Sequence, residues 1–236
     1  MEADYTEWIR ALAGGGEAAE RAARAIGARP EWRSGPPPRE LLNWLLAPPC
    51  DSDSRVFGLA RGWERAPMCR ALLAEFVDTI DEQSKTHIAW LLKEFPAPEE
   101  WERLAAIAGS PQAPPQARSH LIQALQQLVF GRFIGWHELG PLAEQLRGDP
   151  APAIREAVAG LVGSLPASES GMKLLSELLY DRDAAVIGVA AWALANHREM
   201  NEFVPRQRVK ELLQHSSLNV RMLAERLLAS LDSEDG

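Results

Sequence analysis

The chain has 236 residues, a formal net charge of −8 and an apolar fraction of 46%. That length is ample for a buried core, and the eight tryptophans argue against intrinsic disorder. The acidic balance argues against a general nucleic-acid binder, which needs a basic face to neutralise phosphates. Two cysteines are too few for a disulfide scaffold, so a cytoplasmic location is expected.

The residue types predict an all-α protein. The sequence contains 36 Ala and 31 Leu, against only 22 Val, Ile and Thr together. Alanine and leucine are strong helix formers, whereas β-branched residues are enriched in strands. The longest apolar run, residues 184–195, is too short to span a bilayer, so no membrane association is expected.

Helical segments follow one another along the chain. The breaks between them are short and contain Pro, Gly, Asp and Ser, as helix caps and stops require. No window shows sustained alternation of β-branched residues, so no strand is expected. The predicted helices span residues 3–13, 17–28, 38–47, 53–64, 67–80, 83–95, 98–109, 115–131, 136–147, 151–164, 169–180, 183–196, 205–214 and 218–231.

A unit of about 35 residues repeats in the C-terminal half. Similar apolar helical stretches begin at Ala117, Ile154, Val186 and Val220, at spacings of 37, 32 and 34 residues. The last three are each preceded by a shorter amphipathic helix. Repeated helical hairpins of this length are typical of an α-solenoid.

The repeated pattern resembles a HEAT repeat, in which a leucine-rich helix and an Asp-containing turn precede Val-Arg-x-x-Ala-x-x-Ala-Leu. The three matching copies are Leu146–Asp149 with Ile154-Arg155, Leu179–Asp181 with Val186, and Leu213–His215 with Val220-Arg221. Ile187 departs from the pattern where Arg is expected, and His215 where Asp is expected.

The resemblance implies an α-α superhelix, a HEAT-like solenoid of about seven antiparallel helical hairpins. It covers residues 98–236 as HEAT-like repeats. Residues 1–97 follow the hairpin spacing loosely, and we expect them to be divergent hairpins in the N-terminal part of the same solenoid. Many unrelated functions use this scaffold, so the resemblance alone does not define a role.

The second helix of each hairpin is the candidate binding element. With the first apolar residue of each motif as offset zero, offsets 2, 6 and 9 lie opposite the core-facing stripe. In two of the four helices these positions carry few polar residues. One interpretation is that neighbouring helices cover most of each helix. The other is an apolar floor around Trp192, extended by Met222 and Arg226.

The resemblance supports the second interpretation, because second helices line the concave face of HEAT-like solenoids. The candidate partner-binding residues are therefore Trp192, Met222, Arg226, Glu156, Arg155 and Arg221. A structural alternative applies to Arg155. In HEAT-like repeats the turn Asp and the motif Arg form a ladder between repeats. Here one copy, with Asp149 and Arg155, has both residues, so we expect an incomplete ladder.

No motif for catalysis or metal binding is present. The five histidines are far apart in sequence, and no His-x-x-x-His or Cys-x-x-Cys grouping occurs. A phosphate-binding loop and a Gly-x-Ser-x-Gly elbow are also missing. We therefore expect no cofactor, no metal ion and no enzymatic activity.

The sequence favours a non-catalytic protein-binding scaffold that acts through its concave surface. An immunity-type inhibitor of a toxin or other enzyme, or an adaptor, fits a small acidic solenoid. A basic partner is expected, partly because residues 71–110 carry eight acids against three bases. The sequence does not predict the oligomeric state.

Two enzymatic alternatives follow from the scaffold. HEAT-like alkylpurine DNA glycosylases use Trp, Asp and Arg on a concave surface, and Trp192, Asp149 and Arg155 are the matching residue types. The chain has only four lysines, which weighs against a DNA groove. Phycobilin lyases are a second HEAT-like relative, with no residue here that singles them out.

Overall fold

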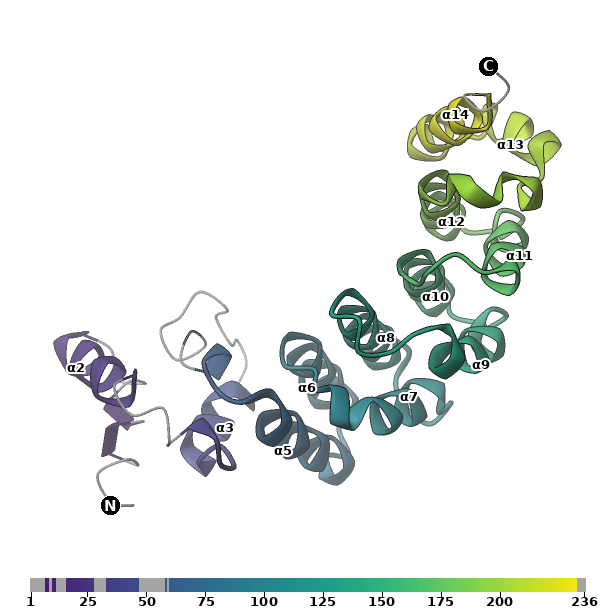
Figure 1. Cartoon of the computed structure of the whole chain (residues 1–236). Helices are drawn as coiled ribbons and strands as arrows, with labels where there is room; N and C mark the ends of the chain where they lie inside the picture. The colour runs from purple at the N-terminus through teal and green to yellow at the C-terminus, as the bar shows by residue number, and fades with distance from the viewer. Residues whose placement is uncertain are drawn as a thin grey trace. The chain divides into compact units, whose positions relative to one another are not determined.

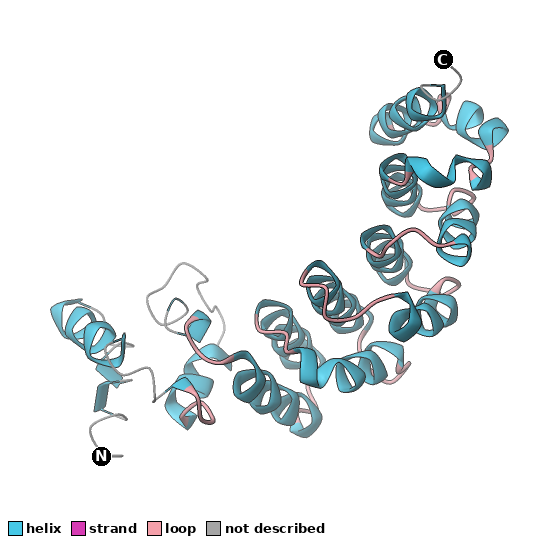
Figure 2. Ribbon diagram, in the orientation of Figure 1, coloured by secondary structure: helices cyan, strands magenta, loops and turns pink. Residues whose placement is uncertain are grey.

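The computed structural model describes residues 7–8, 10–11, 16–27, 33–46, 58 and 60–232. This part of the chain consists of helices and loops without a strand (Figure 2), which confirms the all-α prediction. The predicted helices 3–13 and 53–64 lie mostly outside the described residues. By its contacts the chain divides into two compact units, Met1–Glu102 and Arg103–Gly236.

The first unit contains four described α-helices and a short 3-10 helix. These are α2 (Gly16–Gly27), α3 (Arg39–Leu46), α5 (Arg65–Asp78), α6 (Glu82–Glu94) and η2 (Pro98–Glu100). Helices α5 and α6 pack against each other, and α3 also contacts α6. Fully buried side chains such as Met68, Leu72 and Leu91 form the core here. Asp81 begins α6 by accepting a hydrogen bond from the Ser84 backbone N–H (2.7 Å), and hydrogen bonds from Ser84 lower the pKa of Asp81.

The second unit is a stack of helical hairpins. The boundary with the first unit falls near the start of α7 (Trp101–Gly109). The helices that follow are α8 (Pro115–Phe130), α9 (Trp136–Leu146), α10 (Pro152–Ser164), α11 (Glu169–Leu178), α12 (Ala184–Asn196), η3 (Arg198–Phe203), α13 (Arg206–Leu212) and α14 (Leu218–Asp232). Helices α8, α10, α12 and α14 pack side by side as one row, and α9, α11 and α13 form the other (Figure 1). The predicted hairpin repeat is thus confirmed. The short helix η3 was not predicted from the sequence.

Small residues set the close approach of neighbouring helices within the row. A Cβ atom at Gly163 of α10 would lie 2.5 Å from the Ala193 Cβ of α12, and one at Gly188 of α12 would lie 3.3 Å from the Leu223 Cδ1 of α14. Gly163 and Gly188 occupy offsets 9 and 2 of their motifs. One side of each helix therefore faces the next helix.

This packing corrects the expectation that offsets 2, 6 and 9 all face solvent. At offsets 2 and 9, Ser119, Gly188 and Ala195 are buried because the following helix covers them. Offset 6 stays open, as Trp192 shows. The covering of each helix by its neighbours, which was one of the two interpretations of the sequence, explains the small residues at offsets 2 and 9.

Two buried ion pairs join the turns of successive repeats. Arg118 of α8 donates to Asp149 (2.8 Å), and Arg155 of α10 donates to both oxygens of Asp181 (2.6 and 2.8 Å). Each arginine pairs with the turn aspartate of the next repeat, so an ion pair forms even where one repeat does not contain both an Arg and an Asp. Arg118, which the sequence analysis did not assign, forms the first pair. The series ends at Ile187, in agreement with the expected incomplete ladder.

Candidate functional site

The open side of the α8, α10, α12 and α14 row is the candidate binding surface, and we call it the inner row. In Figure 1 these helices lie on the inner side of the curve of the second unit. The side chains of the inner row are exposed or half-exposed: Gln116, His120, Gln123, Gln127, Ala153, Gly160, Ser164, Ala185, Val189, Trp192, Asn196, Asn219, Leu223 and Arg226.

Trp192 is the one Trp, Tyr or Phe side chain of the inner row, and 40% of its surface is exposed. Gly160 occupies the equivalent position one repeat earlier, where an added Cβ would have no atom nearer than 3.7 Å. One repeat later the equivalent residue is Arg226, whose Nη2 donates to Asn196 Oδ1 (3.0 Å). The indole therefore lies between a residue without a side chain and a fixed guanidinium.

Amide side chains make up much of the rest of the inner row. Gln123, Gln127, Asn196 and Asn219 each carry a group that can both donate and accept hydrogen bonds. Arg226 is the one Arg, Lys, Asp or Glu of the inner row, so this surface is almost uncharged. Amides and small side chains match the polar groups of a peptide backbone better than they match a phosphate chain.

Two of the predicted site residues hold turns and lie away from the inner row. Arg155 is only 6% exposed, and its Nη1 also donates to the Asp149 carbonyl oxygen (2.7 Å). The hydrogen bonds that Arg155 donates to Asp181 raise the pKa of Arg155 and lower the pKa of Asp181. Arg221, half-buried, donates in the same way to the His215 carbonyl oxygen (2.7 Å). Because both guanidinium groups bind turn carbonyls, we leave these arginines out of the proposed surface.

The other four predicted residues are more accessible but do not form one surface. Trp192 and Arg226 belong to the inner row. Glu156 is half-exposed at the start of α10. Met222 is 56% exposed and occupies offset 2 of α14. In α12 the residue at offset 2, Gly188, faces the following helix and not the inner row. With Leu218 and Ala229, Met222 lies on the end side of α14 and does not extend the floor around Trp192.

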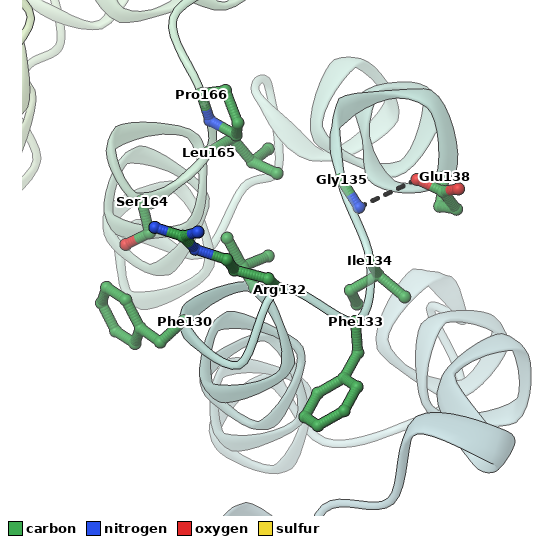
Figure 3. Close-up of a pocket in the computed structure, with 10 residues that line it drawn as sticks. Phe130, Arg132, Phe133, Ile134, Gly135, Glu138, Ser164, Leu165 and Pro166 are labelled. Atoms are coloured by element: carbon green, nitrogen blue, oxygen red, sulfur yellow. Dashed lines mark hydrogen bonds between the residues drawn. The ribbon is translucent and has the colours of Figure 1, made fainter.

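A group of exposed side chains at the turn between α8 and α9 was not predicted from the sequence. Phe130 and Phe133 are more than half exposed and line a pocket with Arg132 (Figure 3). The signal in the sequence was Phe133, which lies in the predicted break between the helices 115–131 and 136–147, with Phe130 at the end of the first of them. An aromatic residue in a break is not explained by a core position on a helix.

The structure does not assemble the residues behind the DNA-repair alternative. Asp149 and Arg155 are buried and committed to the ion pairs between turns, whereas Trp192 lies on the inner row. The inner row also carries no lysine and a single arginine. A surface that neutralises phosphates needs several exposed cations, so nothing here favours DNA binding.

The described residues provide neither a cluster of metal ligands nor a membrane-spanning helix. In this part of the chain no three His, Cys, Asp or Glu side chains are grouped to hold a metal ion. No described helix is both long enough and apolar enough to cross a membrane.

Solved structures similar to this chain include designed armadillo repeat proteins. A designed armadillo repeat protein in complex with the peptide (KR)4 is 14% identical, with 95% of this chain and 98% of that chain covered and a TM-score of 0.54. An engineered protein is 17% identical, with 98% and 99% covered and a TM-score of 0.56. Armadillo repeat proteins designed for modular peptide recognition are 13% identical, with 95% and 98% covered and a TM-score of 0.52.

These similarities place the fold among the all-α repeat solenoids. At identities this low they concern the fold alone. No protein-family model matches the sequence, and no curated protein matches it either.

Proposed function

We propose that this protein is a non-catalytic binding module of the HEAT-like kind, whose inner row holds an extended segment of a partner protein. The observation that carries the proposal is Trp192, which is 40% exposed in a row of small and amide side chains. A half-exposed tryptophan costs hydrophobic stabilisation in the free protein and recovers it when a partner covers the ring.

The amide groups support an extended peptide as the ligand. Gln123 lies on α8, Asn196 on α12 and Asn219 on α14, and each can pair with backbone N–H and C=O groups. The similar designed armadillo protein was solved with a peptide, (KR)4. In this chain, amides on three helices around one aromatic anchor would pair with the backbone of a bound peptide and cover one of its apolar side chains.

We further propose that the partner is basic and that the protein acts as an inhibitor or an adaptor in the cytoplasm. The net charge of −8 supports a basic partner, because charges outside the contact surface still attract it at long range. An inhibitor would occupy the basic active site of a toxin or other enzyme, and an adaptor would hold a basic tail. Residues 1–97 would contribute divergent hairpins of the same repeat class, as the packed pair of α5 and α6 supports.

The test is a selection of random dodecapeptides on the immobilised full chain, followed by affinity measurements with variants. We expect Trp192→Ala to weaken the selected peptides by about thirtyfold, the effect of losing an aromatic hot spot. Asn196→Ala should also weaken them, by about fivefold, since it removes one hydrogen-bonding amide. Met222→Gln is the matched control, because Met222 is exposed on the end side of α14.

Circular dichroism of each variant checks that the helices are retained. If Trp192→Ala and Asn196→Ala both keep the wild-type affinity for every selected peptide, the inner row is not the binding surface. A selection that yields no binder contradicts the proposal as well.

A further inference from the structure

A pocket of about 680 Å³ opens at the end of α8 and α10, at the turn that leads to α9 (Figure 3). Its buried wall includes Ile134 and Leu165, and its rim carries Phe130 and Phe133. These two phenylalanines are 61% and 62% exposed. Large apolar side chains that are this exposed at a pocket are typical of an interaction site.

The turn has an unusual backbone. Helix α8 ends in a Schellman motif: the Arg132 N–H donates to the Val129 carbonyl (2.8 Å), and the Phe133 N–H donates to the Leu128 carbonyl (3.1 Å). This motif requires one residue in the left-handed region, and that residue is Arg132, with φ of 59°. Glycine is favoured there because any Cβ is strained.

The sequence does place a glycine in this turn, but one residue earlier. Gly131 has φ of −73°, which any residue adopts. A Cβ at Gly131 would, however, lie 2.4 Å from the Phe133 ring. The glycine thus makes room for the exposed ring, while an arginine occupies the strained position. The glycine at 131 and the arginine at 132 thus keep the Phe133 ring and the Arg132 guanidinium exposed, at a cost to the stability of the turn.

The guanidinium of Arg132 is available to a ligand. Among the described residues its side chain forms no ion pair or hydrogen bond. Figure 3 shows it extending across the pocket on the side of Ser164. The one carboxylate that lines the pocket, Glu138, accepts a hydrogen bond from the Gly135 N–H (2.9 Å), which lowers the pKa of Glu138. That carboxylate is therefore committed to the start of α9.

We propose that this pocket is a second binding site, for a segment of a partner protein in which an Asp or Glu side chain lies beside an aromatic or aliphatic one. The carboxylate would pair with the Arg132 guanidinium, whose planar donors match a carboxylate. Apolar side chains next to that carboxylate would cover the rings of Phe130 and Phe133, which extend in different directions from the turn (Figure 3). A single arginine beside Glu138 does not suit a phosphate chain, so a nucleic acid is not the expected ligand.

The site is tested with blocked pentapeptides Ac-Gly-X-Glu-Z-Gly-NH2, in which X and Z are each Phe, Leu, Trp or Tyr. A matched panel carries Gln in place of Glu. Titrations of the full chain are followed by NMR. We expect Glu peptides to bind about tenfold tighter than their Gln counterparts, the effect of one charge-assisted hydrogen-bonded pair. Resonances of Phe130, Arg132 and Phe133 should shift.

Variants separate the two parts of the site. Arg132→Gly should abolish the preference for Glu without lowering the melting temperature, since glycine relieves the strained backbone. Arg132→Lys should keep part of the preference. Gly131→Ala, which displaces the Phe133 ring, should weaken the Glu and Gln panels equally. Trp192→Ala should change neither the affinity for the Glu panel nor that for the Gln panel, because Trp192 belongs to the inner row and does not line the pocket.

Several results would overturn the proposal. These are the failure of every Glu peptide to bind at millimolar concentration, equal binding of the two panels, and a Glu preference that survives in Arg132→Gly. Shifts of the same pocket resonances by a single-stranded oligonucleotide, in place of the peptides, would also overturn it.

Discussion

Asp181 is held by Arg155 of the preceding repeat, and both side chains are more than nine-tenths buried. Two parallel hydrogen bonds from a guanidinium to a carboxylate give strong pairing as well as fixed geometry. The aspartate also accepts the Asp183 backbone N–H (2.8 Å). This residue therefore connects two repeats and shapes the turn before α12.

Asp181→Asn should lower the free energy of unfolding by about 3 kcal/mol at pH 7, because it leaves a buried guanidinium without its counter-ion. The pKa of Asp181 is lowered in the folded state, chiefly by the hydrogen bonds from Arg155. Its stabilising effect is thus complete above the unfolded pKa, near 4, and is lost as the pH falls through the folded value. Urea unfolding at pH 7, 4 and 2.5 checks this.

The difference between wild type and Asp181→Asn should shrink as the pH falls from 4 to 2.5. A difference that stays constant over this range would show that the aspartate charge does not hold the turn.

Arg132 lies in the left-handed region, at a position where glycine is free of strain. Arg132→Gly should therefore raise the free energy of unfolding, or at least leave it unchanged. We expect a gain of up to about 1 kcal/mol, reduced by the larger entropy of glycine in the unfolded chain. Thermal unfolding followed by circular dichroism is the measurement, with Arg132→Ala as the comparison. A marked loss of stability in the glycine variant alone would mean that the side chain supports the turn.

Two glycines of α10 differ in what surrounds them, and so they test the packing between helices. A Cβ at Gly163 would lie 2.5 Å from the Ala193 Cβ of α12, whereas at Gly160 the nearest atom would be 3.7 Å away. Gly163→Ala should cost about 2 kcal/mol because α10 and α12 must move apart. Gly160→Ala should stabilise by up to about 1 kcal/mol through helix propensity.

Chemical denaturation of the two alanine variants gives both values. Equal effects at the two sites would contradict the close packing of α10 on α12.

The sequence predicted most helices of the second unit to within two residues, because apolar periodicity and Pro or Gly breaks are local signals. It did not predict which arginine meets which aspartate. Arg118 and Asp149 are 31 residues apart, and their pairing depends on how one repeat stacks on the next. For the same reason Met222 was grouped with Trp192: periodicity within one helix does not show which sides its neighbours cover.

The left-handed backbone conformation of Arg132 could not be predicted from the sequence either, because glycine is the residue expected in that conformation and Gly131 lies next to it. The glycine is needed for the Phe133 ring, which is a side-chain contact. Backbone strain of this kind follows from the closed turn and not from residue type.

On the scale of the whole molecule, most charged side chains lie outside the proposed binding surface, the inner row. The chain carries a net charge of −8, yet the inner row has one fully charged side chain, Arg226. Long-range charge raises the association rate, whereas contacts within an interface set the dissociation rate. A basic partner would thus be attracted by the protein as a whole and retained by uncharged contacts.

Binding kinetics of a selected basic peptide at 50 and 500 mM NaCl should reflect this separation. The association rate should fall by about tenfold at the higher salt, and the dissociation rate should change by less than about twofold. An acidic contact surface would instead produce a large rise in the dissociation rate, which would contradict a neutral inner row.

The most direct test of the proposed function is to locate a selected peptide on the full chain by NMR, through the indole N–H resonances of the tryptophans. Trp192→Phe assigns the relevant resonance. We predict that the Trp192 indole and the side-chain amides of Asn196 and Gln123 shift on titration, while the methyl resonance of Met222 does not. Shifts that leave Trp192 and these amides unchanged and gather elsewhere would contradict binding at the inner row.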